Sequence, residues 1–473
     1  MKQKYLFYII GVLVLCSCND FLTEYPTNNE NVPNFYKTEA DIEQGVNAAY
    51  NALAASGEYG KNFIYLMEVR SDNSSVGSLT NSGGIYGDIY LFRESPYNVV
   101  LNDTWVACYE GIKRCNIVLD RINNVEIEEG KKNKFIGEML FIRALTHFNL
   151  VRLWGDIPLV THYYESPFDA FKEGRTPSDE VYKSIVSDLK EAINLLPDTK
   201  DKNRPGAPIA SAAKALLSKV YVTLNQYNEA KPLLSEVINS GTYSFMNSYA
   251  EIFDVTKKNN AESIFEIQYS GSDTGLGSAF ANIFAPAGSR ELTTGVGTTE
   301  GGNLPTKEFV NSYENGDLRK DVTVGTVADG TLYCKKFVAA PVLANQSDAN
   351  FIVMRYTDVL LLYAETLNEL SYSATGEAIS ILNQVRSRAG LSGLNETDLP
   401  DKASFKKAII KERRYEFAFE NHRWFDLTRT NTAIEAIKDS DRKITISNYQ
   451  MVYPIPQKQI DVAPGIMNQN PNY

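Results

Sequence analysis

The chain has 473 residues, 43% of them hydrophobic, and a formal net charge of −11 at pH 7. This length and composition allow a large buried core. An acidic chain without basic runs is not expected to bind nucleic acid or anionic lipid as its main partner. The five cysteines and three histidines show no spacing typical of a metal site, so the cysteines of the body are interpreted as core thiols.

The N-terminal segment has the layout of an export signal. Lys2 and Lys4 precede an apolar stretch of about 11 residues, whereas roughly 20 are needed to span a bilayer. Ser17 then precedes Cys18, which resembles the lipobox of bacterial lipoproteins, where the cysteine is acylated and becomes the mature N-terminus. We therefore expect a signal peptide at residues 1–17 and a lipidated, flexible tether at residues 18–34. The alternative is an ordinary secretory signal that leaves Cys18 free.

The body, expected at residues 35–473, begins with a predicted helix. Thr38 and Asp41 resemble a capping box, and apolar residues at helical spacing follow until Gly57, the expected stop. Residues 57–102 have no helical period and are rich in Gly, Ser and Asn, with scattered aromatic residues. Such aromatic side chains either anchor a loop in the core, which is the commoner role, or form a surface on which a ligand stacks.

Helical spacing returns at Asp103 and again over Lys134–Leu153. A further helix is expected where Thr176 is placed to cap it and Pro177 to lie in its first turn. The clearest pair of helices spans Ala210–Ser240, and small residues on its first helix would let a neighbour approach closely. Two tightly joined helices of this length resemble a tetratricopeptide unit.

A second helix pair is expected within residues 355–389, and because no constant period links the pairs we expect degenerate repeats interrupted by insertions. The largest insertion spans about residues 254–350. In it, Glu262–Ser270 alternates apolar and polar residues, which predicts a strand. Residues 271–302 contain eight glycines, too many for any regular element. Near the end, Lys443–Tyr453 alternates again and is expected to be strand and loop.

Three carboxylates, Glu412, Glu416 and Glu420, recur at four-residue spacing, which predicts one helical face. Such a cluster could serve acid–base catalysis, but the neighbouring arginines make structural ion pairs the favoured interpretation. The histidines lie in no nucleophile or metal motif; they are His147, His162 and His422. We therefore do not expect an enzyme.

Motifs spread over nearly the whole chain point to one family. They lie at residues 18–22, 137–158, 355–365, 385–390, 412–429 and 469–473. The most specific is Glu412-Arg413-Arg414-Tyr415-Glu416. Together they resemble the SusD/RagB lipoproteins of Bacteroidetes outer membranes, with the C-terminal motif region at about 351–473. The resemblance implies a mostly α fold with about four tetratricopeptide-like helix pairs, a loop-rich region and a few short strands.

The resemblance also implies exposure on the outer-membrane surface and a partner, a SusC-like TonB-dependent transporter. Such proteins bind glycans, or peptides in some members, before import and catalyse nothing. A sugar site needs aromatic rings for C–H faces and polar groups for hydroxyls. The insertions at about 57–102 and 254–350 supply both kinds. The candidate ligand-binding residues are Asp72, Asn73, Tyr86, Tyr90, Phe92, Arg93, Phe280, Phe284 and Arg290.

Starch-binding relatives use an aromatic arc rich in tryptophan. The three tryptophans here fall in the predicted helical framework, which puts starch in doubt as the ligand; they are Trp105, Trp154 and Trp424. Three hypotheses remain: a glycan-binding importer subunit, a peptide-binding RagB-like subunit of the same kind, and a tetratricopeptide scaffold that binds only proteins. No cofactor is predicted beyond the lipid on Cys18, and calcium in the loops is left open because no ligand spacing demands it.

Overall fold

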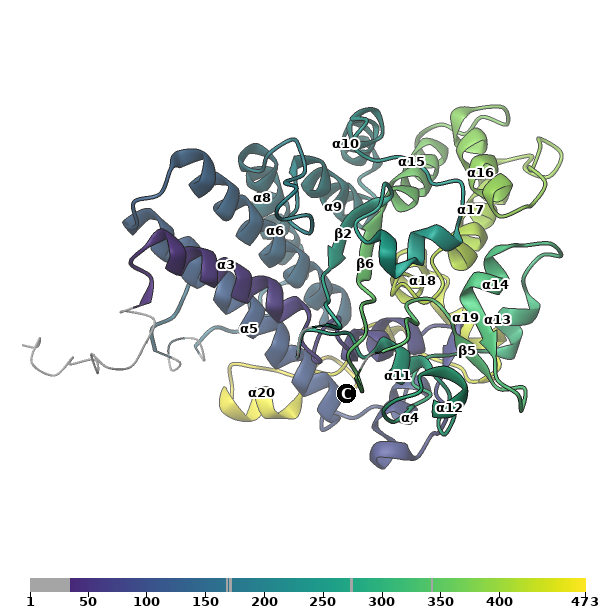
Figure 1. Cartoon of the computed structure of the whole chain (residues 1–473), viewed down its shortest axis with the longest axis horizontal. Coiled ribbons are helices and arrows are strands. Elements are labelled where there is room, and N and C mark those ends of the chain that lie inside the picture. The colour runs from purple at the N-terminus through teal and green to yellow at the C-terminus, as the bar shows by residue number, and fades with distance from the viewer. Residues whose placement is uncertain (1–34, 167–168, 170–171, 273–274, 342) are drawn as a thin grey trace, which may run out of the picture.

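The computed structural model describes residues 35–473 apart from 167–168, 170–171, 273–274 and 342. The predicted signal peptide, the lipidation site Cys18 and the tether therefore lie outside the described residues. The described chain is mostly helical with a few short strands, as the sequence predicts (Figure 1). None of the helices in this part of the chain is long and apolar enough to cross a membrane.

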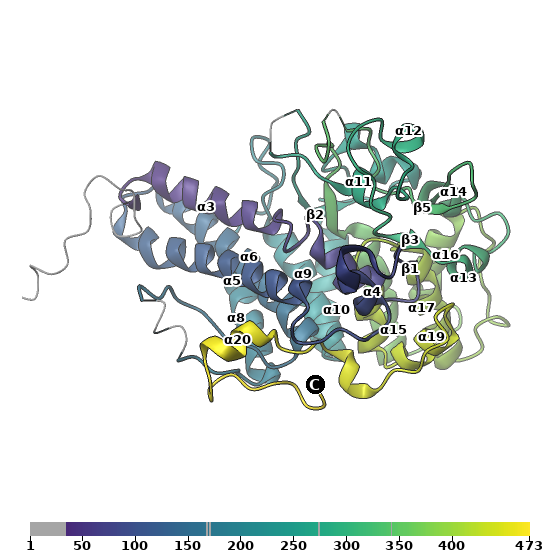
Figure 2. The same cartoon turned by 90° about the horizontal axis from the view of Figure 1, so that it is seen from below.

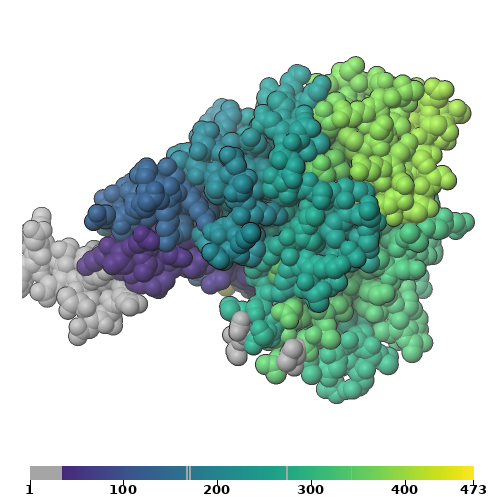
Figure 3. Space-filling model, turned by 45° about the horizontal axis from the view of Figure 1, so that its top comes forward, coloured from purple at the N-terminus to yellow at the C-terminus, as the bar shows by residue number. Residues whose placement is uncertain are grey.

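The longer helices form a layered array in which each packs against the next in the series α3, α5, α6, α8, α9, α10 and α15. Their bounds are α3 Glu39–Leu53, α5 Val99–Arg121, α6 Glu129–Trp154, α8 Ser178–Leu195, α9 Ala210–Thr223, α10 Tyr227–Asn239, α15 Tyr356–Leu370, α16 Glu377–Arg388 and α17 Lys402–Glu416. The predicted pairs are confirmed as α9 with α10 and α15 with α16. In Figure 3 the purple-to-blue N-terminal helices form the narrower end of the body, and teal-to-green residues form the broader end.

The ends of the helices test the capping predictions. The capping box of α3 is confirmed: the Thr38 hydroxyl accepts from the Asp41 amide at 3.3 Å, and the Asp41 carboxylate accepts from the Thr38 amide at 2.8 Å. The helix ends at Leu53, before the expected Gly57. The prediction for Thr176 is wrong, because it forms a β-bridge with Ile157 while Pro177 occupies the N-cap position of α8.

Short helices fill segments in which no helix was expected. Residues 57–102 hold the π-helix η2 (Ile64–Val69), the 3₁₀-helix η3 (Asn81–Gly84) and α4 (Ile85–Tyr90). The glycine-rich stretch holds α11 (Phe280–Phe284) and α12 (Arg290–Thr293). Helices of one or two turns are too short to leave a periodic pattern in the sequence. The other short helices are η4 Ile122–Asn124, η5 Ala250–Phe253, η6 Val255–Lys257, α13 Lys307–Asn311, α14 Arg319–Thr323, α18 Arg423–Arg429, α19 Ala433–Asp439, η7 Asn448–Met451 and α20 Gln457–Val462.

Three antiparallel two-stranded ladders are present in the described residues: β2 (Ser263–Ile267) with β6 (Phe351–Arg355), β1 (Ser74–Ser75) with β3 (Leu304–Pro305), and β4 (Val324–Thr326) with β5 (Leu332–Cys334). The predicted strand is confirmed as β2, although all five of its residues are buried. Because Ser263 pairs with Arg355 and Ile267 with Phe351, this ladder draws together the two ends of the large insertion.

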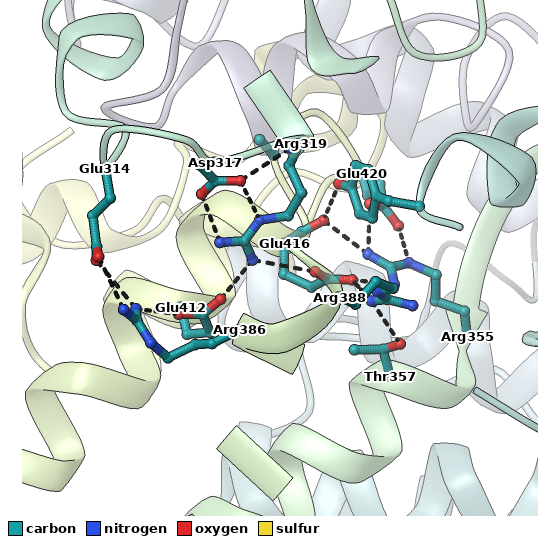
Figure 4. A network of polar contacts seen from close by, with 12 residues as sticks. Glu314, Asp317, Arg319, Arg355, Thr357, Arg386, Arg388, Glu412, Glu416 and Glu420 are labelled. Atoms are coloured by element: carbon teal, nitrogen blue, oxygen red, sulfur yellow. Dashed lines mark hydrogen bonds and ion pairs between the residues drawn. The ribbon is translucent and has the colours of Figure 1, made fainter. Parts of the chain in front are cut away.

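A buried network of ion pairs joins this ladder to α17 (Figure 4). Arg355 donates to Glu416 at 2.6 Å and to Glu420 at 2.8 Å, and all three side chains are fully buried. Arg319, on α14, donates to Glu412 at 2.6 Å. Burial alone would raise the pKa of Glu416, but the arginines around it hold that pKa well below its usual range. The structural ion pairs expected of these glutamates are therefore present, and each carboxylate is held by a cation.

One part of that prediction is wrong. Helix α17 ends at Glu416, so Glu420 does not lie on its face. Phe419 and Asn421 have φ of 66° and 62°, which breaks the helical path. Their amides donate to the buried Glu68 carboxylate at 3.0 and 3.1 Å, so a side chain of η2 stabilises this turn.

Candidate ligand-binding site

The two loop-rich insertions meet on one surface, which the sequence alone did not predict. Ser74 and Ser75 pair with Pro305 and Leu304 in the β1–β3 ladder. Gly77 donates its amide to the Gly301 carbonyl at 2.8 Å. We name the accessible surface of residues 61–93 and 286–307 the loop face. Figure 2 shows β1 and β3 beside α4, with α11 and α12 beyond them.

A pocket of about 400 Å³ opens on the loop face beside Tyr90, and we name it the Tyr90 pocket. It combines one aromatic ring with hydroxyl, ammonium and carboxylate groups from four separate segments. The polar lining includes Ser75, Thr306, Lys307, Asp329, Thr331 and Asp441. Such a mixture of one ring and several hydrogen-bonding groups suits a polar ligand that also has an apolar face.

Arg442 fixes the position of Tyr90. Its guanidinium carbon lies 4.3 Å from the centroid of the Tyr90 ring. The same guanidinium donates to the backbone carbonyls of Tyr90 and Arg70, both at 2.9 Å. Burial raises the pKa of Tyr90, so its hydroxyl stays protonated at neutral pH. The ring therefore reaches the pocket already oriented, with a phenol that can donate a hydrogen bond.

Tyr86 is the second half-buried ring of the loop face. It stacks on the buried Tyr65 with ring centroids 3.8 Å apart and an interplanar angle of 18°. The ammonium of Lys61 lies 5.5 Å from the Tyr86 centroid and pairs with Glu300 at 2.7 Å. Tyr86 thus packs against two residues of its own insertion, and one of them, Lys61, pairs with the other insertion.

Several of the predicted site residues lie beneath this surface. Asp72 is buried and pairs with Arg423 at 2.8 Å and with Arg414 at 3.1 Å. Burial alone would raise the pKa of Asp72, but these two guanidinium groups hold it well below its usual range. Asn73 is also buried and accepts from Arg414 at 2.8 Å. Phe92 is buried against Trp424, with ring centroids 5.5 Å apart.

The remaining candidates are also either buried or accessible. Phe280 and Phe284 are fully buried, with ring centroids 5.7 Å apart. Arg93 and Arg290 are exposed, the first 3.7 Å from Asp88. Buried side chains can affect a ligand only through the residues above them. Contact with a ligand stays a prediction for the accessible candidates, which are Tyr86, Tyr90, Arg93 and Arg290.

Sequence reasoning missed most of the Tyr90 pocket. Asp329 and Thr331 come from the turn between β4 and β5, where the Thr331 amide donates to Asp329 at 2.8 Å and Gly330 has a φ of 87°. An Asp-Gly pair between short alternating segments is a hairpin signal that could have identified this turn. Lys307 and Asp441 carry no local signal, because only the fold brings them to Tyr90.

The buried histidines do not act as titrating groups at neutral pH. Burial lowers the pKa of His147 to about 3, and burial with the nearby Lys219 does the same for His422. Within the described ranges, no group of three or more His, Cys, Asp or Glu side chains could hold a metal ion. All three tryptophans are buried in the framework, as expected from their positions.

Comparison with known proteins identifies the family. The SusD family model matches residues 318–473, and a second model, described as starch-binding associating with outer membrane, matches residues 20–222. SusD-like protein P2 of Formosa agariphila is 27% identical over 512 residues, covering 100% of both chains. A SusD-like protein of Bacteroides ovatus is 25% identical and covers 90% of this chain and 82% of its own.

Solved structures agree with this result. A laminarin-binding SusD-like protein has a TM-score of 0.80 at 26% identity, covering 93% of this chain and 100% of its own. A SusD superfamily protein from Parabacteroides distasonis has a TM-score of 0.79 at 26% identity, covering 91% and 99%. The helical fold with its few short strands is therefore that of SusD-like proteins. The chain belongs to the SusD/RagB family of binding proteins, which are not enzymes.

Proposed function

We propose that this chain is a surface-exposed lipoprotein that captures oligo- or polysaccharide and delivers it to a SusC-like TonB-dependent transporter in the outer membrane. The observation that carries the proposal is the loop face, where Tyr86 and Tyr90 are half-buried and Tyr90 lines a pocket with polar side chains. Sugars present apolar C–H faces to such rings and hydroxyl groups to carboxylates and hydroxyls. The export signal and Cys18 support the lipid anchor.

The names of the relatives support the same class of ligand. One structural neighbour is described as laminarin-binding, and the family model over residues 20–222 is named for starch binding at the outer membrane. The absence of tryptophan from the loop face argues against starch, since the described chain buries all three tryptophans in its framework. We therefore place laminarin first among the glycans to test.

The test is affinity electrophoresis of residues 19–473 through gels that contain laminarin, starch and a panel of plant, host and microbial polysaccharides. The site variant is the double substitution Tyr86→Ala and Tyr90→Ala. Phe92 is left intact because it is buried against Trp424 and its truncation would disturb the fold. The matched control is Tyr227→Ala, a half-buried tyrosine on α10 within the helical array.

Retardation by one glycan that is lost in the double variant and kept in the Tyr227→Ala control would support both the function and the site. Retardation that survives the double variant would keep the function and move the site elsewhere on the chain. Failure of every glycan to retard the protein would contradict the proposal. Binding of short peptides would then be measured, because a peptide-binding importer subunit is the alternative in this family.

A further inference from the structure

A small cavity lies inside the frame, between α6 and α9 of the helical array and the turn that joins α17 to α18; we name it the Arg152 cavity. Its volume is about 40 Å³, which is room for about three water molecules. A sugar ring is too large to enter it. The polar lining includes Tyr59, Arg152, Lys219, Arg413, Asn421 and Asp426.

Most of the charges around this cavity neutralise one another. Three cations and three carboxylates alternate, each joined to the next by a nitrogen–oxygen distance of 2.8 or 2.9 Å, in the order Lys219, Asp358, Arg413, Asp426, Arg429 and Glu365. Glu420 also lines the cavity, but it pairs with Arg355 and with Lys336, both at 2.8 Å. His422 is neutral at pH 7, since its pKa is lowered to about 3 by burial and by Lys219.

Arg152, on α6, is a further cation at this cavity and has no such partner. Its guanidinium carbon lies 3.7 Å from the centroid of the Phe148 ring and 3.6 Å from that of Phe425. These rings attract a cation but do not neutralise it. In the described part of the chain Arg152 forms no ion pair, and the nearby carboxylates act on it only at longer range. Burial lowers the pKa of Arg152 to about 10, so the side chain keeps its charge at neutral pH.

Hydrogen-bond donors without an acceptor belong to the same lining. The Nη2 of Arg413 and the side-chain nitrogen of Asn421 are buried and have no partner among the described residues. The Nε and Nη2 of Arg152 donate to the Phe148 carbonyl and to Asn149, which leaves Nη1 without an acceptor in the described chain. The side-chain oxygen of Asn421 is a buried acceptor that is also unpaired.

This excess of donors selects the kind of occupant. An anion accepts charge-assisted hydrogen bonds from several donors at once. A water molecule also accepts, but it brings two donors of its own that need acceptors and supplies no charge opposite Arg152. The volume then limits the anion to one of about the size of a water molecule, with room for a little water beside it.

We propose that the Arg152 cavity binds one small inorganic anion of the size of chloride, which pairs with Arg152 and accepts from Arg413 and Asn421. The anion completes the charge balance at the contact of α6 with α18, so its binding stabilises the frame. This site goes beyond the proposed function and does not rest on it.

The direct test replaces chloride by bromide, at about 0.15 M, in crystals of residues 19–473. Bromide has the same charge and a similar size, and its anomalous scattering marks its position. We expect a peak in the cavity within hydrogen-bonding distance of Arg152. Crystals of Arg152→Met should lack the peak, because methionine can pack on the same two rings but carries no charge. Crystals of the control Arg93→Met, at an exposed position, should keep it.

Thermal unfolding at constant ionic strength measures the same site in solution. Sodium chloride replaces sodium gluconate, whose anion is too large for the cavity, so the screening of other ion pairs does not change. The melting temperature of the native chain should rise with chloride and level off, gaining about 2 °C more than that of Arg152→Met. The difference between the two chains removes the general effects of the two salts.

Asn421→Gly removes one donor and keeps the backbone. Asn421 has a φ of 62°, which glycine adopts readily, and its backbone amide can still donate to Glu68. The chloride concentration that gives half of the effect should rise about tenfold, as expected for one hydrogen bond to a charged group. The matched control is Asn431→Gly, an exposed asparagine with a φ of 57°, which should respond like the native chain.

Bromide in the cavity, with a chloride response that Arg152→Met loses and Arg93→Met keeps, would support the proposal. Water alone in the cavity, or bromide found only at surface positions, would overturn it. An equal chloride response in the native chain and in Asn421→Gly would also overturn it, and this comparison decides the question if Arg152→Met does not fold.

Discussion

Lys61 and Glu300 form an ion pair of 2.7 Å although they are 239 residues apart in the sequence. Each belongs to a different insertion, and the pair lies beside Tyr86 on the loop face. The two side chains are 24% and 34% exposed, so solvent screens their attraction. The pair therefore positions the two insertions more than it stabilises the whole protein.

Reversing one charge of this pair should weaken ligand binding, and reversing both should restore it. Glu300→Lys places two cations side by side, whereas Lys61→Glu with Glu300→Lys recreates the attraction. A double-mutant cycle in urea unfolding should give a coupling of about 0.2–1 kcal/mol, because the pair is partly exposed. Glycan retardation should decrease in the Glu300→Lys variant and return in the double variant. Equal retardation in all of them would show that the pair does not shape the site.

Removing the central arginine of the buried network should be far more costly. Arg355→Met leaves Glu416 and Glu420 buried with fewer cations, and breaking such a pair costs about 3–5 kcal/mol in the free energy of unfolding. Urea unfolding followed by circular dichroism measures this change. The control Arg93→Met, at an exposed position, should stay within about 0.5 kcal/mol of the native chain. A similar small loss for Arg355→Met would contradict the role given to the network.

Glu58 should make stability fall as the pH rises from 4.5 to about 8. Its carboxylate is fully buried without a hydrogen-bond partner in the described chain, and this burial raises its pKa from 4.5 to about 8. Between these two values the folded state holds a proton that the unfolded state has released. The contribution of Glu58 to the free energy of unfolding is therefore undiminished below pH 4.5 and falls as pH rises toward 8.

Glu58→Gln removes this titration. Melting temperatures of the native chain and the variant should be similar at pH 5, and the variant should be the more stable of the two at pH 8.5. The comparison between variants is needed because Glu68 also has a pKa raised by burial, to about 7, and contributes to the slope of the native chain. Parallel melting profiles across this pH range would rule out a buried proton at Glu58.

Arg442→Lys should damage the Tyr90 pocket while leaving the frame folded. Lysine keeps the charge but lacks the planar fork that donates to the carbonyls of Arg70 and Tyr90. Loss of these bonds should release the Tyr90 ring and weaken glycan binding by about tenfold, equivalent to 1.4 kcal/mol. Isothermal titration with the retarding glycan measures the affinity, and circular dichroism checks the fold. Unchanged affinity would show that Tyr90 needs no support from Arg442.

The sequence was most informative where local chemistry decides the structure. The capping box of Thr38 and Asp41 is a short-range signal, and the α9–α10 pair carries a clear helical period. The strand expected within Lys443–Tyr453 is absent, because apolar and polar residues can also alternate in a segment that pairs with no strand. Tyr453 is buried but donates its amide to the Leu153 carbonyl at the end of α6, 2.7 Å away.

For the loop face, the sequence predicted candidate residues but not which of them are accessible. Sequence reasoning selected Tyr86 and Tyr90, which are accessible, together with Asp72 and Phe280, which are buried. A loop sequence gives no period from which to tell these two groups apart. That distinction depends on partners such as Arg423, which is distant in the sequence and meets Asp72 only after folding.

The large insertion is held to the helical array at both of its ends. The β2–β6 ladder and the Arg355–Glu416 pair hold both ends of the insertion against α17, whatever lies between them. Once the two ends of a loop are fixed, its length adds little to the free energy of closing it. Substitutions, insertions and deletions in the exposed loops between Ile267 and Phe351 can therefore accumulate without unfolding the helical array, as long as buried contacts such as that of Arg319 with Glu412 are kept. Under the proposed function, the glycan that is captured can change through the loops of this one segment, while the helices that carry it stay the same.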